Sequence, residues 1–326
     1  MTPPVPPVVA VVGPTAAGKS ALSLALAEAL GGGVGGGVGG EVGGEVGGEI
    51  VNADSMQLYR GMDVGTAKLR PHERAGIAHH VLDIWEVTEP ASVAEYQRLA
   101  RAAVDDIRAR GRVPLVVGGS GLYVRAVLDE MDFPGTDPQL RAELEDELAR
   151  VGPNPLYERL RAADPAAAEA ILPSNGRRIV RALEVIALTG RPFTARLPGP
   201  RPAYPAVWLA VDRDDVDERV AARVARMWDE GLVEEVRGLV DRGLRRGRTA
   251  RAALGYAQVL QYLGGEITEE GAYGETIRAT RRFVRRQRSW FRRDPRLQWL
   301  DGSRPDLVDT AVAAVNAGVA ATGGGG

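Results

Sequence analysis

The chain has 326 residues and no cysteine, which excludes disulfide bonds, thiolate catalysis and a cysteine-ligated zinc site. Its hydrophobic content of 44%, charged content of 26% and formal net charge of −2 are ordinary for a soluble globular protein and exclude a polycation. No segment approaches the roughly 20 continuous apolar residues of a membrane helix. We therefore expect a cytoplasmic protein of about two domains, or one large domain with an insertion.

A phosphate-binding loop directly follows the first predicted strand, at residues 8–12. Residues 13–20 read Gly-Pro-Thr-Ala-Ala-Gly-Lys-Ser, which fits the pattern G-x-x-x-x-G-K-[ST], and an apolar helix is predicted up to residue 30. Glycine leaves backbone N–H groups open to an anion, and the helix N-terminus adds partial positive charge. Lys19 can reach terminal phosphate oxygens, and the Ser20 hydroxyl can hold Mg²⁺. The loop predicts a phosphate or diphosphate ligand without specifying ATP.

The next part of the chain predicts a parallel sheet wrapped by helices. A glycine-rich repeat at 31–48 is expected to form a flexible loop. Strands are predicted at 50–53, 81–85 and 113–117, and a helix from Ser92 to Arg110 with Ser92 and Glu95 as a capping box. Strands that alternate with helices and end in glycine-rich turns are typical of this α/β arrangement.

From residue 123 onward the pattern changes to charged, alanine-rich helical segments. No strand is convincing between 137 and 195, and a strand at 206–211 then returns to the sheet. We expect a catalytic core over 1–124 and 201–312, an all-helical insertion over 125–200 and a disordered tail over 313–326. The predicted helices of the second half are 138–150, 155–163, 165–171, 176–189, 214–230, 231–243, 255–264 and 274–293.

Arginine is concentrated in the last of these helices. Nine arginines lie between residues 274 and 296 against only Glu275 and Asp294, a local excess that is typical of a polyanion contact. An amphipathic surface helix is the alternative, because Phe283 and Val284 provide a core-facing side.

Six further short sequence motifs follow the phosphate loop along the chain. They are DSMQLY at 54–59, GMDVGTAK at 61–68, VGGSGLY at 117–123, RALE at 181–184, GY at 255–256 and TRRFVRRQ at 280–287. In this order, together with the phosphate loop, they resemble the tRNA dimethylallyltransferases (tRNA isopentenyltransferases, the IPP transferase family) over most of the chain. The resemblance implies a P-loop NTPase-like fold that no longer transfers phosphate. It also implies transfer of a dimethylallyl group from dimethylallyl diphosphate to the exocyclic amine of the adenosine 3′ of the tRNA anticodon, with release of diphosphate.

The resemblance also implies site residues. Asp54 is the expected general base, although an ordinary turn role is the alternative from the residues alone. The other expected catalytic residues are Thr15, Lys19 and Ser120, and Mg²⁺ is expected at Ser20. Diphosphate is expected to bind at Gly13, Pro14, Thr15, Ala16, Ala17, Gly18, Lys19 and Ser20. The expected tRNA contacts are Asp54, Ser55, Met56, Gln57, Ser120, Arg141, Arg177, Arg178 and Arg181.

Three other functions stay open from the sequence. An isopentenyltransferase could act on free adenine nucleotides, although the insertion and the arginines argue against it. A P-loop kinase of small metabolites would share the phosphate loop, and a glycine tract that damages the site would leave a non-catalytic RNA-binding protein. For the tRNA-modifying function, a monomer without a membrane partner is expected.

Overall fold

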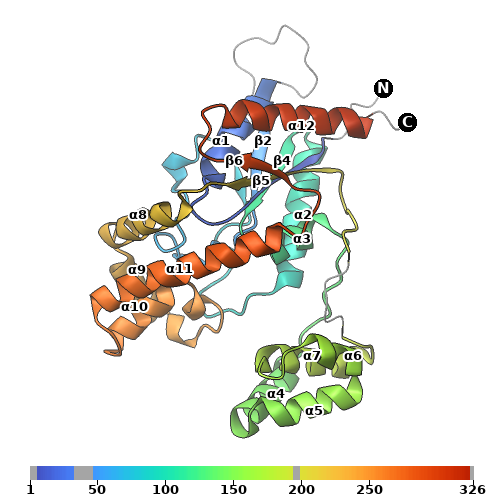
Figure 1. The fold of residues 1–326 in the computed structure, drawn as a ribbon, viewed down its shortest axis with the longest axis vertical. Helices are drawn as coiled ribbons and strands as arrows, with labels where there is room; N and C mark the ends of the chain where they lie inside the picture. The colour runs from blue at the N-terminus through green and yellow to red at the C-terminus, as the bar shows by residue number, and fades with distance from the viewer. Residues whose placement is uncertain (1–5, 33–46, 194–198, 324–326) are drawn as a thin grey trace. The chain divides into compact units, whose positions relative to one another are not determined.

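The computed structural model describes residues 6–32, 47–193 and 199–323 (Figure 1). The predicted glycine-rich loop falls mostly outside these ranges. At its edges, Leu30–Gly32 form a short 3₁₀ turn (η1) and Gly48 begins a strand.

A six-stranded parallel sheet forms the centre of the larger unit, in the order β3-β2-β4-β1-β5-β6. The central strands are valine-rich and buried on both sides, as expected where helices cover both faces of a parallel sheet. The fold class predicted from the sequence is confirmed. The strands are β1 (Val8–Val12), β2 (Gly48–Asn52), β3 (His79–His80), β4 (Val113–Gly118), β5 (Ala206–Asp212) and β6 (Gln298–Asp301).

Different pairs of helices cover the two faces of this sheet. On one face, α1 (Lys19–Ala29) and α12 (Leu307–Gly323) pack buried side chains such as Leu26 and Val315 against the odd-numbered residues of β1. On the other face, α2 (Val93–Ala109) and α3 (Gly121–Leu128) pack against its even-numbered residues. The alternation along β1 therefore divides the core into two layers.

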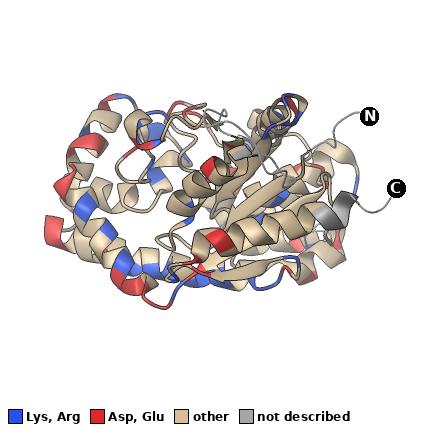
Figure 2. Cartoon of the chain, turned by 90° about the horizontal axis from the view of Figure 1, so that it is seen from above, with Lys and Arg blue, Asp and Glu red and all other residues tan. Residues whose placement is uncertain are grey.

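Charged residues of both signs are interspersed over the helices (Figure 2). Within the residues that the structure describes, none of the helices is both long enough and apolar enough to cross a bilayer.

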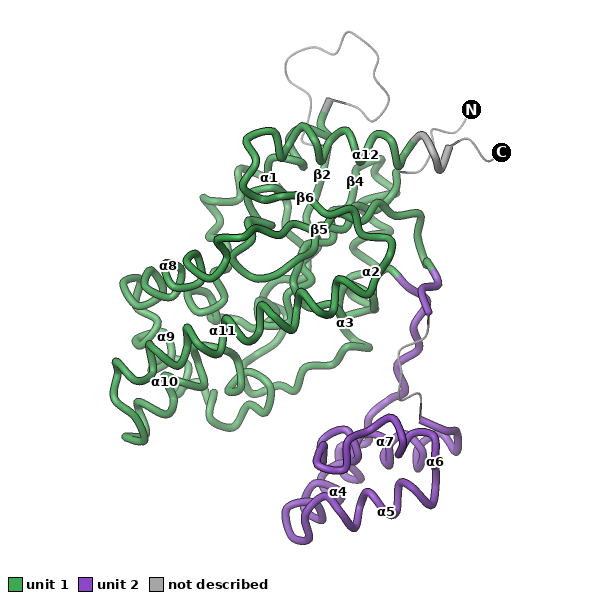
Figure 3. The backbone as a smooth tube through the Cα atoms, viewed as in Figure 1, with its two compact units in different colours: residues 1–128, 202–326 green, residues 129–201 purple. Residues whose placement is uncertain are grey.

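The chain divides into two compact units (Figure 3). The larger contains Met1–Leu128 and Pro202–Gly326, and the smaller contains Asp129–Arg201, whereas the sequence placed the boundaries at 125 and 200. The smaller unit is helical and has its own core around Leu156, Leu160 and Ile179. Its helices are α4 (Pro138–Val151), α5 (Pro153–Ala163), α6 (Pro165–Ala170) and α7 (Gly176–Thr189). The larger unit adds α8 (Val216–Asp229), α9 (Leu232–Asp241), α10 (Tyr256–Leu263), α11 (Glu269–Phe291) and the 3₁₀ turns η2 (Pro71–Glu73), η3 (Leu244–Arg246) and η4 (Ala250–Ala252).

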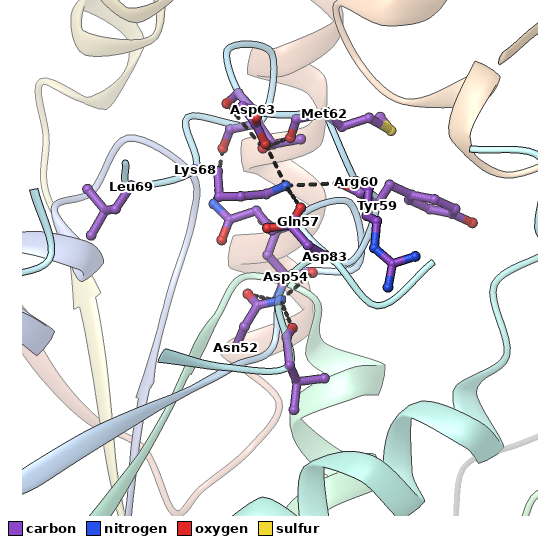
Figure 4. Close-up of polar contacts among 12 residues, drawn as sticks. Asn52, Asp54, Gln57, Tyr59, Arg60, Met62, Asp63, Lys68, Leu69 and Asp83 are labelled. Atoms are coloured by element: carbon purple, nitrogen blue, oxygen red, sulfur yellow. Dashed lines mark hydrogen bonds and ion pairs between the residues drawn. The ribbon is translucent and has the colours of Figure 1, made fainter. Parts of the chain in front are cut away.

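The prediction of a strand at 81–85 is wrong, because the structure has a loop there. The strand consists of His79 and His80, after which Val81 and Asp83 adopt left-handed backbone conformations with φ of 60° and 54°. The buried ammonium of Lys68 lies 2.5 Å from Asp83 Oδ1, and the Asn52 amide donates to the Val81 carbonyl (Figure 4). These contacts hold the segment in a loop that a period-two pattern cannot reveal.

The disordered tail predicted at 313–326 is also wrong for residues 313–323, which continue α12. Ala311 and Val315 are fully buried, because their spacing of four residues puts both on the helix face that meets the sheet. Residues 324–326 lie outside the described ranges. The sequence also missed α3 and β6, and it began α11 five residues late because Gly271 and Gly274 interrupt its pattern.

A buried carboxylate fixes the start of β2. Only 3% of the Glu49 side chain is exposed, and it forms ion pairs with Arg110, with Arg112 at 3.2 Å and with His80 Nε2 at 2.6 Å. The hydrogen bonds from Arg110 lower the pKa of Glu49 to about 2. Burial acts in the opposite direction, and the hydrogen bond from His80 lowers the pKa further.

We expect Glu49→Gln to lower the free energy of unfolding by about 2 kcal/mol at pH 7, because the variant loses charge-assisted hydrogen bonds. The pKa of Glu49 is depressed on folding, so its stabilisation is full above pH 4.5, its ordinary pKa, and is lost as the pH falls towards 2. Urea unfolding between pH 7 and pH 3 should show a smaller loss of stability in the variant. Parallel curves for the two proteins would contradict this assignment.

Candidate active site

The phosphate loop leaves β1 at Gly13 and enters α1 at Lys19. Gly13 has φ of 134°, and a Cβ there would lie 2.1 Å from the Val211 carbonyl oxygen on β5, so only glycine fits. Gly18 also has a left-handed conformation, with φ of 103°. Within the described residues, the N–H groups of Ala16 and Gly18 have no hydrogen-bond acceptor. The loop therefore retains donors for an anion.

Lys19 lies among three other charged groups of this edge of the sheet. Its ammonium donates to the Pro14 carbonyl at 2.7 Å. Burial lowers the pKa of Lys19 to about 8, and the nearby guanidinium of Arg223 adds to this, whereas Asp54 and Asp212 act in the opposite direction. Charges from the start of α1, the turn after β2, the end of β5 and α8 thus meet where parallel sheets place their ligands.

Asp54 lies just beyond β2, in a turn held by Asn52. The Asn52 side chain accepts from the Asp54 N–H at 2.9 Å and donates to the Asp54 carbonyl at 3.1 Å (Figure 4). The Asp54 Oδ1 atom accepts from the Met56 N–H at 2.9 Å. The carboxylate therefore has a defined orientation, and it does take part in a turn, the alternative that the sequence left open.

Ser120 joins the loop after β4 to the Asp54 segment. Its hydroxyl accepts from the Ser55 N–H at 3.2 Å and donates to the Ser55 hydroxyl at 3.1 Å. A Cβ at Gly118 would lie 2.2 Å from the Ala53 carbonyl oxygen, so glycine allows the two strand ends to approach this closely. Gln57 extends the contact by donating to the Thr66 carbonyl at 3.2 Å.

Arg223 on α8 is a site residue that sequence reasoning missed. It is half-buried and donates to the Thr66 carbonyl at 2.9 Å. Burial lowers the pKa of Arg223, and the charge of Asp54 opposes this effect. Arg219, four residues earlier on the same helix, donates to the Ala16 carbonyl of the phosphate loop at 2.9 Å. The four-residue spacing of these arginines was the only local signal.

The oxygen donors of this edge suit Mg²⁺, which prefers oxygen ligands and takes few of them from protein. Ser20 is exposed at the first turn of α1, and Asp54 and Asp212 lie near Lys19. Over the described ranges, His, Asp and Glu form no cluster of three or more that could hold a metal.

Comparison with known proteins identifies the family. Residues 57–294 match the model of the IPP transferase family. A tRNA dimethylallyltransferase of Salinispora arenicola is 68% identical over 312 residues, which cover 95% of this chain and 86% of the relative. This chain belongs to the IPP transferase family.

Solved structures agree with this membership. A tRNA isopentenylpyrophosphate transferase of Bacillus halodurans is 36% identical with a TM-score of 0.67, and the match covers 97% of this chain and 99% of that one. A eukaryotic dimethylallyltransferase acting on tRNA is 25% identical with a TM-score of 0.76, over 94% of this chain and 76% of that one.

In the helical unit of this IPP transferase, the four predicted tRNA-binding arginines divide into two pairs. Arg141 and Arg181 both form ion pairs with Glu184, whose side chain is fully buried. Burial alone would raise the pKa of Glu184, but hydrogen bonds from the two arginines outweigh it and lower the pKa. Arg177 and Arg178, by contrast, are exposed near the start of α7. Arg141 and Arg181 thus have a structural role in the unit, and RNA contact by any of the four stays a prediction.

The arginine-rich helix α11 of the IPP transferase has the two sides that the sequence left as alternatives. Arg288 forms a bidentate ion pair with Asp212 at 2.8 Å, and the Arg281 guanidinium donates to the Asp217 carbonyl. Arg285 and Arg286 are exposed. The helix is therefore packed against the core on one side and presents cationic groups on the other.

We expect the affinity for inorganic diphosphate to fall as the pH rises through about 8. Lys19 is charged below this pH, and a bound diphosphate anion would raise its pKa, so above pH 8 binding must include uptake of a proton. Titration calorimetry between pH 6.5 and 9.5 measures this, and Lys19→Arg, which stays charged, should flatten the dependence. A wild-type affinity that does not change across pH 8 would contradict the prediction.

Proposed function

We propose that this chain transfers a dimethylallyl group from dimethylallyl diphosphate to the exocyclic amine of the adenosine 3′ of a tRNA anticodon. One observation supports this most directly: Asp54 lies with Lys19 and Arg223 at the mouth of a phosphate loop. The Asp54 carboxylate and two cations at one edge suit a reaction in which an amine loses a proton and a diphosphate leaves. The names of the related proteins agree with this substrate pair.

The phosphate loop and two cations hold the leaving diphosphate. As the allylic carbon–oxygen bond breaks, negative charge grows on the diphosphate, and positive charge placed in advance lowers the barrier. Lys19 and Arg223 provide this charge, and Arg219 holds the loop through the Ala16 carbonyl. Ser20 would hold Mg²⁺, which when bound further neutralises the diphosphate.

Asp54 accepts the proton of the attacking amine. The nitrogen forms a bond to the allylic carbon, the diphosphate leaves with the electron pair of the carbon–oxygen bond, and an N–H proton passes to the carboxylate. The Met56 N–H and the Asn52 side chain fix the carboxylate beforehand, so no reorganisation is needed at the moment of reaction.

The adenosine has to leave its stack to reach this edge, and the protein must therefore hold the RNA backbone around it. We propose that Ser55, Met56, Gln57 and Ser120 border the base, and that Arg177 and Arg178 contact anticodon-loop phosphates. Segment 55–57 and Ser120 are half-buried and hydrogen-bonded to one another or to neighbouring loops. A cytoplasmic monomer is sufficient for this reaction.

A pair of substitutions separates the base role of Asp54 from its turn role. Asp54→Asn keeps an oxygen that can accept from the Met56 N–H, whereas Asp54→Ala loses it. Both variants should slow transfer by about 10²-fold or more and leave tRNA affinity unchanged. The measurement is a single-turnover assay with labelled dimethylallyl diphosphate, tRNA and Mg²⁺, with AMP and ATP as parallel acceptors.

Two outcomes of that assay would contradict the proposal in different ways. Near wild-type transfer by Asp54→Asn would make the turn the important role and contradict the base assignment. Label on AMP or ATP in the wild-type reaction would instead identify an isopentenyltransferase of free nucleotides.

We expect Arg177→Ala and Arg178→Ala together to weaken tRNA binding and to reduce the slope of log affinity against log salt by about 1 to 2. Fluorescence anisotropy with labelled tRNA at several salt concentrations measures both. Arg161→Ala is the matched control: Arg161 is an exposed arginine of the same unit that lies outside the predicted tRNA contacts, so its loss should leave tRNA affinity and the salt slope close to those of the wild type. An unchanged salt slope in the double variant would place the RNA elsewhere.

A further inference from the structure

The geometry assigns Gln287 of α11 as a positioning residue that fixes the diphosphate loop. The inference rests on the proposed function, in which that loop holds the leaving group. Gln287 is 6% exposed, and its side chain reaches two segments more than 160 residues away in the sequence. A buried carboxamide is expensive to leave without partners, so its contacts define where it can lie.

The two ends of the carboxamide bind groups of opposite kind. Its oxygen accepts from the Thr15 N–H in the phosphate loop at 2.9 Å, and its nitrogen donates to the Gly119 carbonyl after β4 at 2.9 Å. An amide N–H can only donate and a carbonyl can only accept, so the carboxamide has one satisfactory orientation. Gln287 thereby joins the phosphate loop to the loop that contains Ser120.

Glycine at 119 makes this bridge possible. A Cβ at that position would lie 2.3 Å from Gln287 Nε2, closer than any real contact. The neighbouring Gly121 is restricted in the same way, because a Cβ there would lie 1.9 Å from Trp290 Nε1. Side chains of α11 therefore occupy the space that these two glycines leave empty.

Adjacent residues of α11 hold the helix at the same edge. Arg288 pairs with Asp212 at the end of β5, while Gln287 contacts the loops after β1 and β4. One turn of a single helix thus binds the ends of three neighbouring strands. Since the carboxamide is set on an anchored helix, the position of the Thr15 amide depends on α11 and not only on the loop sequence.

The hydrogen bond from the Thr15 N–H to Gln287 gives the backbone N–H groups of the phosphate loop two different roles. The Thr15 N–H is bound to protein, whereas the N–H groups of Ala16 and Gly18 have no acceptor within the described residues. Thr15 therefore anchors the loop, and its neighbours remain for the anion. Loss of the anchor should weaken diphosphate binding without changing the charge of the site.

Two variants at this position test the inference. Gln287→Met fills a similar volume but loses both hydrogen bonds, and it should weaken inorganic diphosphate binding about tenfold. Gln287→Glu keeps an oxygen for the Thr15 N–H but sets a carboxylate against the Gly119 carbonyl and adds negative charge beside the loop, so it should weaken diphosphate binding at least as much. The KM for dimethylallyl diphosphate should rise in parallel, and tRNA affinity should change less than twofold.

Thr276→Val is the matched control on the same helix. Thr276 is 2% exposed and donates to the Ala272 carbonyl, so its loss also removes a buried hydrogen bond, about 16 Å further along the helix axis. It should lower the melting temperature without affecting diphosphate binding. Titration calorimetry with inorganic diphosphate, thermal unfolding and steady-state kinetics are measured on all four proteins.

The inference is overturned if Gln287→Met, like Thr276→Val, lowers only the melting temperature and binds diphosphate as the wild type does. Equal weakening of diphosphate and tRNA binding would also overturn it, because that result would mean general loss of structure. A wild type that binds diphosphate but transfers nothing to tRNA would contradict the proposed function. The role of Gln287 would then be decided by the diphosphate affinities of the wild type and the Gln287 variants alone. A wild type that does not bind diphosphate would refute both.

Discussion

The close approach of backbone at the carboxyl edge of the sheet is the constraint on which the rest of the site depends. Gly13 meets the Val211 carbonyl, and Gly118 meets the Ala53 carbonyl, with no space for a Cβ at either position. These approaches bring Ser120 within hydrogen-bonding distance of Ser55 next to Asp54, and they allow Gln287 to bridge the phosphate loop and Gly119. A larger residue would separate the strand ends, and the charged groups would no longer share one small volume.

The electrostatics of that volume follow from its composition. Two cations, Lys19 and Arg223, lie near each other and near Asp54, and burial lowers the pKa of both cations. A site with this balance is unfavourable when empty and favourable when an anion arrives. The proposed diphosphate would relieve the repulsion between these cations, and the hydrogen bonds from Gln287 and Arg219 hold the loop backbone in place around them.

The helical unit shows the same separation between structural and exposed charge. Glu184 is buried with Arg141 and Arg181, and this triad holds α7 against the segment before α4. Arg177 and Arg178 on the same helix remain at the surface. The three arginines of α7 that appear equivalent in the sequence thus have two kinds of environment, because only side chains on one face of α7 meet the unit's core.

The sequence by itself determined the features that depend on neighbouring residues. The phosphate loop, the N-cap of α2 at Ser92, most helices of the smaller unit and the parallel α/β class were all evident from local patterns. Only the tertiary structure decided the features that depend on distant partners. The loop at 81–85 replaces a strand because Lys68 and Asn52 bind it, and α12 is ordered because the sheet covers Ala311 and Val315. Arg223 and Gln287 reach the site only through the packing of α8 and α11. Local patterns record backbone preference and burial, but a long-range hydrogen bond leaves no trace in the residues around either partner.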